Sequence, residues 1–259
     1  MQTLFWIDIV GMGLTILITG STTLTVVGVD SKNPVNRSFG FFTGAMTLWM
    51  ISALLLRISL WLQLILPESI LIFDPEIWLR SATLLILLTC VLSLRFTVIY
   101  LDRVSRWNTV FIALGLLLAA GFLGFSLFFE GSILQYIQFS ESGLIEYGDT
   151  KGQWVVMGLW ASYILWSLVL FIRTPQRKGN VFLTLGMFAL LLGLILRIAI
   201  DARFPFLTFF NGLSALMLAY GVIRRQIFNP LINRTLELQK EVADRQEAEK
   251  QLRAAEHKY

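Results

Sequence analysis

Long apolar runs separated by short polar connections fill most of this chain, and its last part is almost wholly polar. Seven of these runs are long enough to cross the ~30 Å hydrocarbon core of a bilayer as a helix. They cover residues 4–29, 38–66, 76–99, 109–129, 153–172, 181–200 and 206–223. The pattern predicts an all-α membrane protein. We expect a seven-transmembrane helix bundle over residues 1–228 and a cytoplasmic coiled-coil helix over residues 229–259.

The polar tail carries a heptad pattern, in which one set of positions recurs at alternating spacings of four and three. The set comprises Leu231, Thr235, Leu238, Val242, Arg245, Glu249, Leu252, Glu256 and Tyr259. About four heptads favour a coiled coil, although the charged members of the seam weaken it. A solitary solvated helix with many i,i+4 charge pairs is the alternative. We favour a rod that connects the membrane to a domain beyond residue 259, and a homodimer with parallel tails in which Arg245 and Glu249 pair across helices.

Composition agrees with a membrane protein. Of the 259 residues 56% are hydrophobic and only 15% charged, and the mean hydropathy is +0.71. The isoelectric point near 9.4 indicates membrane topology rather than nucleic-acid binding, because the basic residues lie between the apolar runs. The lipid bilayer is therefore an expected partner and nucleic acid is not.

The charges of the connections predict the orientation. The first, third and fifth connections carry Lys32, Arg37, Arg103, Arg106, Arg173, Arg177 and Lys178, whereas the others carry Arg80, Lys151 and Arg203. Basic residues concentrate on the cytoplasmic side of membrane proteins. We expect a multi-pass protein of the bacterial cytoplasmic membrane, with its N-terminus outside and its C-terminus in the cytoplasm.

Catalytic and metal-binding motifs are missing from the sequence. The single histidine, His257, lies in the tail, and the single cysteine, Cys90, lies within an apolar run. Every lysine lies outside the spans, which excludes a retinal Schiff base. We expect no catalytic residue, metal or cofactor in this chain. The longest connection, residues 130–152, is acidic but has no calcium-loop spacing; it is expected to be a solvated loop, with a hairpin or a surface helix as alternatives.

Ionisable residues inside the spans are the best pointers to function, because a charge in lipid is expensive. Arg57, Arg197, Asp201 and Asp8 all fall in the outer half of the predicted bundle, and Trp61 lies close to them in depth. Arg197 and Asp201 are one turn apart and can pair on one helix face. We expect Arg57 to carry an unpaired charge that faces a small anionic or amphipathic ligand. The alternative is that Arg57 reaches the headgroups along its own side chain.

Other residues within the spans are expected to serve packing. Trp49, Trp160 and Trp166 lie deep enough to belong to the core of the bundle. Small residues at four-residue spacing let helices approach closely. The pairs are Gly115 and Ala119, Ala120 and Gly124, and Ala215 and Ala219.

The joint between bundle and tail is predicted at Asn229 and Pro230. Asparagine is a good helix N-cap and proline suits the first helical position, whereas proline inside a helix breaks or kinks it. We expect the last span to end near Phe228 and a separate helix, or a kink, to begin at Pro230. Such a signalling hinge would convert movement of the last span into movement of the tail.

The tail also resembles a known kind of segment. Its residues run Asn229-Pro230-Leu231-Ile232, Glu237-Leu238-Gln239-Lys240-Glu241-Val242, Asp244-Arg245, Ala248-Glu249 and Leu252. They resemble the linker helix that joins bacterial membrane sensors to a PAS or kinase module. With seven spans before it, the chain resembles the N-terminal seven-transmembrane input region of bacterial sensor histidine kinases.

The resemblance implies a non-catalytic input module that relays a stimulus to a downstream PAS domain or histidine kinase of a two-component system. A diguanylate cyclase or a methyl-accepting domain is an alternative output. A different class of function is a small seven-span transporter or channel with a cytoplasmic oligomerisation helix.

Overall fold

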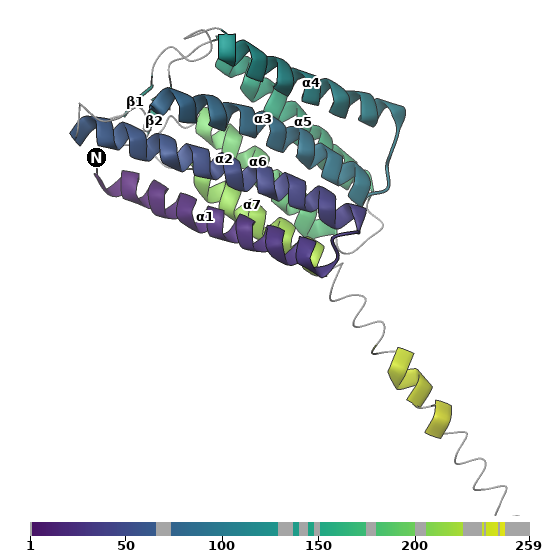
Figure 1. Cartoon of the computed structure of the whole chain (residues 1–259). Helices are drawn as coiled ribbons and strands as arrows, with labels where there is room; N and C mark the ends of the chain where they lie inside the picture. Colours follow the sequence, from purple (N-terminus) through teal and green to yellow (C-terminus); the bar gives the residue numbers. More distant parts are fainter. Residues whose placement is uncertain are drawn as a thin grey trace, which may run out of the picture.

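The structure is a computed structural model that describes residues 2–65, 74–128, 137–139, 145–147, 151–174, 180–199, 206–224, 235, 237–242 and 244–246. Its helices are α1 (Gln2–Val29), α2 (Pro34–Ile65), α3 (Pro75–Tyr100), α4 (Arg106–Phe128), α5 (Lys151–Ile172), α6 (Asn180–Ala199) and α7 (Phe206–Ile223). Figure 1 shows them side by side in one bundle, with the described part of the tail beyond one end.

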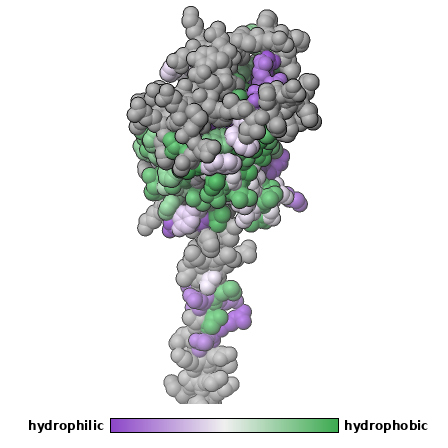
Figure 2. Space-filling model, turned by 90° about the vertical axis from the view of Figure 1, so that its left-hand side faces the viewer, coloured by the Kyte–Doolittle hydropathy of each residue, from purple (hydrophilic) through white to green (hydrophobic). Residues whose placement is uncertain are grey.

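A membrane helical bundle is confirmed. Six helices, α1 to α5 and α7, contain stretches long and apolar enough to span a bilayer. In α6 the apolar stretch that is described, Val181–Leu196, is shorter. On the face of the molecule that Figure 2 draws, the described residues of the bundle form a broad hydrophobic band, and those of the tail are more hydrophilic. Seven spans and the coiled coil therefore stay predictions.

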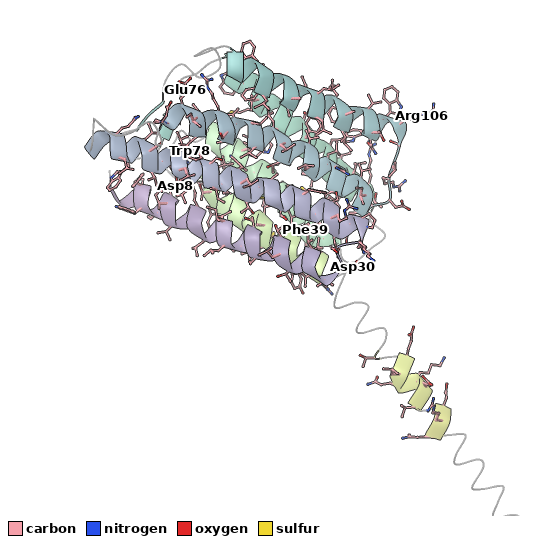
Figure 3. The ribbon with its side chains drawn as sticks, in the orientation of Figure 1. Asp8, Asp30, Phe39, Glu76, Trp78 and Arg106 are labelled. Atoms are coloured by element: carbon pink, nitrogen blue, oxygen red, sulfur yellow. The ribbon has the colours of Figure 1, made fainter. Side chains whose placement is uncertain are left out.

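Six of the helices form a closed ring. Each contacts the next in the order α1, α2, α3, α5, α6, α7, and α7 returns to contact α1. Helix α4 lies outside the ring against α3 (Figure 1). Because successive helices run up and down, two ends can be named. The Asp8 end holds Asp8, Glu76 and Trp78, and the Asp30 end holds Asp30 and Arg106 (Figure 3).

The core of the bundle is built around α2. Phe39, Phe42, Met46 and Trp49 of this helix are at most 5% exposed. The ring of Phe96 in α3 contacts the rings of Phe39 and Phe42, with centroids 5.3 and 6.1 Å away. Such aromatic pairs add about 0.5–1.5 kcal/mol each beyond the area that they bury.

The expected core tryptophans are partly confirmed. Trp49 of α2 and Trp160 of α5 are buried and meet edge to face, with ring centroids 6.1 Å apart. Trp166 is 39% exposed and therefore not a core residue. Its indole N–H instead donates to Asn108 Oδ1 of α4 at 3.1 Å, so Trp166 helps to hold α4 against α5.

The predicted close packing at small residues is correct for one face of α4 and wrong for the other. A Cβ atom on Gly115 would lie 2.5 Å from Tyr163 Oη and 2.5 Å from Val91 Cγ2, so α4 needs glycine there. Ala119 on the same face is buried. Ala120 is exposed, and a Cβ on Gly124 would meet no atom within 4 Å. In α7, Ala215 and Ala219 are buried as expected.

The acidic connection between α4 and α5 contains a short antiparallel hairpin in its described part. Strand β1 (Ile137–Phe139) pairs with β2 (Ile145–Tyr147), and Gln138 stands opposite Glu146. A hairpin was one alternative to the solvated loop that we expected. It lies at the Asp8 end of the bundle (Figure 1).

Candidate functional site

A buried ion pair joins α1 to α2 near the Asp8 end. The Nε atom of Arg57 donates to Asp8 Oδ2 at 2.5 Å, and the two side chains are 11% and 3% exposed. A second guanidinium nitrogen, Nη1, donates to the Ala53 carbonyl oxygen at 3.0 Å. The negative carboxylate and the positive guanidinium therefore compensate each other's charge in a buried place where either charge alone would be costly.

The same carboxylate also holds α7. The Thr208 hydroxyl donates to Asp8 Oδ1 at 2.7 Å, and Thr208 is 4% exposed. Each oxygen of Asp8 thus accepts from a different helix, Oδ2 from α2 and Oδ1 from α7. A Cβ atom on Gly11, one turn further along α1, would lie 3.3 Å from Thr208 Cγ2, which shows how closely α1 and α7 approach here. Asp8 is the point at which three helices meet.

Two tryptophans lie within about one helical turn of this ion pair in sequence, on the side of the Asp8 end of the bundle. Trp6 of α1 and Trp61 of α2 meet edge to face with ring centroids 6.1 Å apart. They are 50% and 37% exposed, so this aromatic pair is accessible at the surface of the bundle. Tryptophans near the ends of membrane-spanning helices are typical of the membrane interface.

The expectation that Arg57 carries an unpaired charge is wrong, because Asp8 neutralises it. Sequence spacing indicated that both residues lie at one depth, but not that they face each other. The side chain of Arg197 and all of Asp201 lie outside the described residues, so their pairing stays a prediction. That Arg57, Arg197, Asp201, Asp8 and Trp61 bind a ligand also stays a prediction.

Two further polar side chains of α7 extend the site towards the middle of the bundle. Asn211 and Ser214 follow Thr208 at successive turns, and both are completely buried. The amide Nδ2 of Asn211 lies 4.0 Å from Met50 Sδ of α2. Within the part of the chain that the structure describes, Asn211 Oδ1 and Ser214 Oγ have no hydrogen-bond partner. A buried polar atom without a partner is costly, so this inward face of α7 has unused hydrogen-bonding capacity.

Two pairs of threonine hydroxyls join α1 to α2 nearer the Asp30 end. Thr47 donates to Thr19 Oγ1 at 2.8 Å, and the hydroxyls of Thr23 and Thr43 lie 2.6 Å apart. Thr23 and Thr43 also lie within hydrogen-bond distance of the Thr19 and Phe39 carbonyls. Each hydroxyl has one proton, so one member of the pair must give up its carbonyl in order to donate across the interface. This contact therefore has two alternative hydrogen-bond arrangements.

Sequence reasoning missed the polar residues on α7 and the threonines. A hydroxyl or an amide can be buried with little sign in a hydropathy profile, whereas a charge is conspicuous. The signal that was available is the spacing of Thr208, Asn211 and Ser214, which recur at every third position within an apolar run. Such spacing places polar groups on neighbouring turns of one helix.

The tail is helical and solvated where it is described. Leu238 and Val242 are 62% and 53% exposed. Arg245 pairs with Glu241 one turn earlier in its own helix, at 2.8 Å. The hinge residues Asn229 and Pro230, and the seam residues Leu231, Glu249 and Leu252, lie outside the described residues. The tail thus presents two apolar side chains that a coiled-coil partner would cover.

The described residues contain no group of three or more histidine, cysteine, aspartate or glutamate side chains that could hold a metal ion. No protein-family model matches the chain, and no curated protein is found similar to it. The likeness of the tail to a signalling linker therefore rests on its own residues.

Proposed function

We propose that this chain is a membrane sensory input and signal-transmission module that relays a stimulus to a cytoplasmic output, expected to be a PAS domain or a histidine kinase. The observation that carries the proposal is the hydrogen bond from Thr208 to Asp8. It ties the first turn of α7 to a buried ion pair, and α7 is the helix that leads in sequence into the tail. A change at the ion pair would therefore act directly on the helix that bears the tail.

The arrangement of charge supports the proposed orientation. The up-and-down path of the helices gathers Lys32, Arg103, Arg106, Arg173 and Arg224 at the Asp30 end, which is also the end from which the tail leaves. The positive-inside rule then puts the tail in the cytoplasm and Asp8 in the outer half of the membrane. In this proposal α6 is the seventh span, and the N-terminus lies outside.

The stimulus would act by competing for Arg57. A carboxylate or a lipid headgroup that reaches the guanidinium past Trp6 and Trp61 can replace Asp8 as its partner, because an arginine fork binds any such anion in the same way. Asp8 would then lose its counter-ion, and its bond to Thr208 would be weakened or rearranged. The ligand shifts the equilibrium only as far as it prefers the rearranged state.

The tail provides the readout for an experiment. We would replace Cys90 by alanine and Leu238 by cysteine, and measure the rate of disulfide cross-linking between tails in native membranes. In that background, Thr208→Val removes the bond between α7 and Asp8 but leaves the ion pair. The matched control is Glu76→Gln, which breaks an exposed ion pair with Arg80 at the same end of the bundle but on α3.

We expect Thr208→Val to change the cross-linking rate of Leu238→Cys and Glu76→Gln to leave it as it is. Equal rates in all three proteins would show that α7 does not communicate with the tail, and the proposal would fail. An absence of cross-linking in every variant, with the protein still folded, would contradict the tail dimer itself.

A small transporter or channel is the second candidate, and the buried polar contacts between α1 and α2 favour it. Asp8, Thr19, Thr47, Thr23 and Thr43 place polar atoms at successive depths from one end of the bundle towards the other. Transport predicts a proton flux in proteoliposomes that exceeds the flux in protein-free liposomes and is lost in Asp8→Asn. Sensing predicts no such flux.

A further inference from the structure

The inward side of α7 carries an asparagine whose amide points into the ring of helices. On one side of α7, a Cβ atom on Gly212 would lie 3.0 Å from Thr15 Oγ1 of α1. On the other side, a Cβ atom on Gly221 would lie 2.9 Å from Leu183 Cγ of α6. An α-helix turns by about 100° per residue, so Asn211 lies between these contacts, about 100° from Gly212 and about 80° from Gly221. Its side chain is therefore directed at the interior of the ring.

The contact with α2 agrees with this direction. In the ring α1 lies between α2 and α7, yet Asn211 Nδ2 lies 4.0 Å from Met50 Sδ of α2. Ser214 follows Asn211 after almost one turn, so both side chains belong to the inward half of the helix. Both are completely buried, and within the described residues Asn211 Oδ1 and Ser214 Oγ have no hydrogen-bond partner. Two unsatisfied polar groups thus lie on neighbouring turns inside the ring.

These two groups differ from other buried polar groups of the bundle. The serines of three other helices, Ser59, Ser93 and Ser167, are also completely buried, but each donates to a carbonyl oxygen of its own helix. In the described part of the chain Ser214 makes no such bond, so its hydroxyl is left for a partner from outside α7. Exchanging the oxygen and nitrogen of the Asn211 amide would leave the nitrogen without a partner in place of the oxygen. The need for a partner therefore does not depend on the orientation of the amide.

We infer that Asn211 and Ser214 form a binding site for a water molecule inside the ring. A water both donates and accepts hydrogen bonds, so it fits the serine hydroxyl and either end of the amide, whereas a cation fits oxygen atoms only. Side chains three residues apart on a helix have Cβ atoms about 5–6 Å apart. One water with two hydrogen bonds of about 2.8 Å each can bridge that span. Buried waters occupy places of this kind, where about two to four otherwise unsatisfied polar groups converge.

The water also has a role in the signalling movement of α7, and this role rests on the proposed function. Thr208, one turn before Asn211, holds α7 to Asp8. When a ligand at Arg57 weakens that bond, α7 turns easily only if its other inward polar groups keep their partners. A bound water can shift together with Asn211 and Ser214, whereas a side chain of another helix could not follow them. The site would therefore lower the cost of turning α7.

The test uses Met50 as a reporter of water at the site. An X-ray pulse converts water into hydroxyl radicals, which oxidise a nearby methionine sulfur to the sulfoxide. Met50 is 2% exposed, so bulk water hardly reaches it, but its sulfur lies beside Asn211. The full chain would be irradiated in lipid nanodiscs, and mass spectrometry would measure the oxidation of Met50 relative to a methionine peptide added to the solution.

We expect Asn211→Leu and Ser214→Ala each to lose most of the Met50 oxidation of the wild type, because each removes one of the two partners of the water. Ser167→Ala is the matched control, since its buried hydroxyl already has a partner in its own helix, and it should leave the oxidation of Met50 unchanged. Thermal unfolding in detergent would verify that the variants are folded. Ser214→Ala removes a single oxygen atom and keeps the test valid if Asn211→Leu does not fold.

The outcomes separate the water site from the proposed function. Equal oxidation of Met50 in the wild type and in both α7 variants would overturn the water site, and so would a fall of the same size in the control. A fall in Asn211→Leu but not in a folded Ser214→Ala would overturn the bridge between the two residues. If the oxidation falls as expected while Thr208→Val leaves the cross-linking of Leu238→Cys unchanged, the water site stands and the proposed function fails.

Discussion

Replacing Asp8 by leucine should destabilise the bundle strongly, and replacing Asp8 and Arg57 together should restore much of the loss. The single change leaves the guanidinium 11% exposed without its carboxylate, and it also deprives the Thr208 hydroxyl of its acceptor. Removing one partner of a buried pair costs about 3–5 kcal/mol, because the remaining charge is uncompensated. A hydrogen bond to a charged group contributes about 1.5–3 kcal/mol, part of which is already included in that loss.

The double replacement Asp8→Leu with Arg57→Leu removes both charges. Exchanging a buried ion pair for apolar side chains is often neutral and can stabilise by about 1–4 kcal/mol. Arg57→Leu alone leaves the buried carboxylate uncompensated at a similar cost of about 3–5 kcal/mol, so the four proteins of this cycle should give a coupling free energy of about 6 kcal/mol or more. That is above the range of about 0.5–3 kcal/mol that residues in contact usually show. The measurement is the free energy of unfolding in mixed micelles titrated with a denaturing detergent.

A matched cycle on Glu76 and Arg80 is the control. This pair has the same 2.5 Å separation, but its side chains are 53% and 29% exposed and lie one turn apart on one helix. Exposed pairs of this kind couple by about 0.3–0.5 kcal/mol. If the Asp8–Arg57 cycle gave a coupling as small as this control, the pair would not be the buried link between α1, α2 and α7 that we describe.

Two further substitutions test the packing of the bundle, each against a control on the same helix. Gly115→Ala should destabilise the bundle by about 1–3 kcal/mol, because the added methyl group would collide with Tyr163. Its control, Gly121→Ala, has open space around the added methyl group and should stabilise by up to about 1 kcal/mol. Both are measured by thermal unfolding in detergent, and a gain or no change for Gly115→Ala would show that α4 is not held at this position. Thr19→Val should lower the free energy of unfolding by about 0.6 kcal/mol, because its hydroxyl contact with α2 is lost. The control, Thr25→Val, loses only an exposed hydrogen bond within α1. Equal free energies of unfolding in the two variants would show that the hydroxyl contact between α1 and α2 does not stabilise the bundle.

Hydropathy alone predicted the helices of this bundle well, because the period and length of an apolar run are local properties. The expected runs at 76–99 and 206–223 match α3 (Pro75–Tyr100) and α7 (Phe206–Ile223) to within a residue at each end. The termini of α3 also have local causes. Asp74 accepts from the backbone N–H of Glu76, and Pro75 occupies the first helical turn, where its missing N–H has no cost.

The sequence predicted the level at which the residues of the candidate site lie along the bundle, but not which of them contact one another. Counting residues from the ends of two runs puts Asp8 and Arg57 at a similar level in the membrane. Their contact also requires that α1 and α2 turn these two faces towards each other, and this depends on the packing of the whole ring. Thr208 lies 200 positions from Asp8 in sequence, so nothing local to either residue indicates their bond.

Helix α7 connects these observations because its inward-facing and outward-facing side chains are attached to one hydrogen-bonded backbone and so turn together. Thr208 and Asn211 face inwards, and Leu216 and Tyr220 lie on the outer side of the same backbone. A rotation of α7 that breaks the bond to Asp8 must turn the outer side by the same angle, since neither face can move without the other. In the proposed function, a dimer contact between the tails and a ligand at the ion pair would then bias one equilibrium. Dimerisation should accordingly change the affinity for the stimulus by the same factor by which the stimulus changes dimerisation.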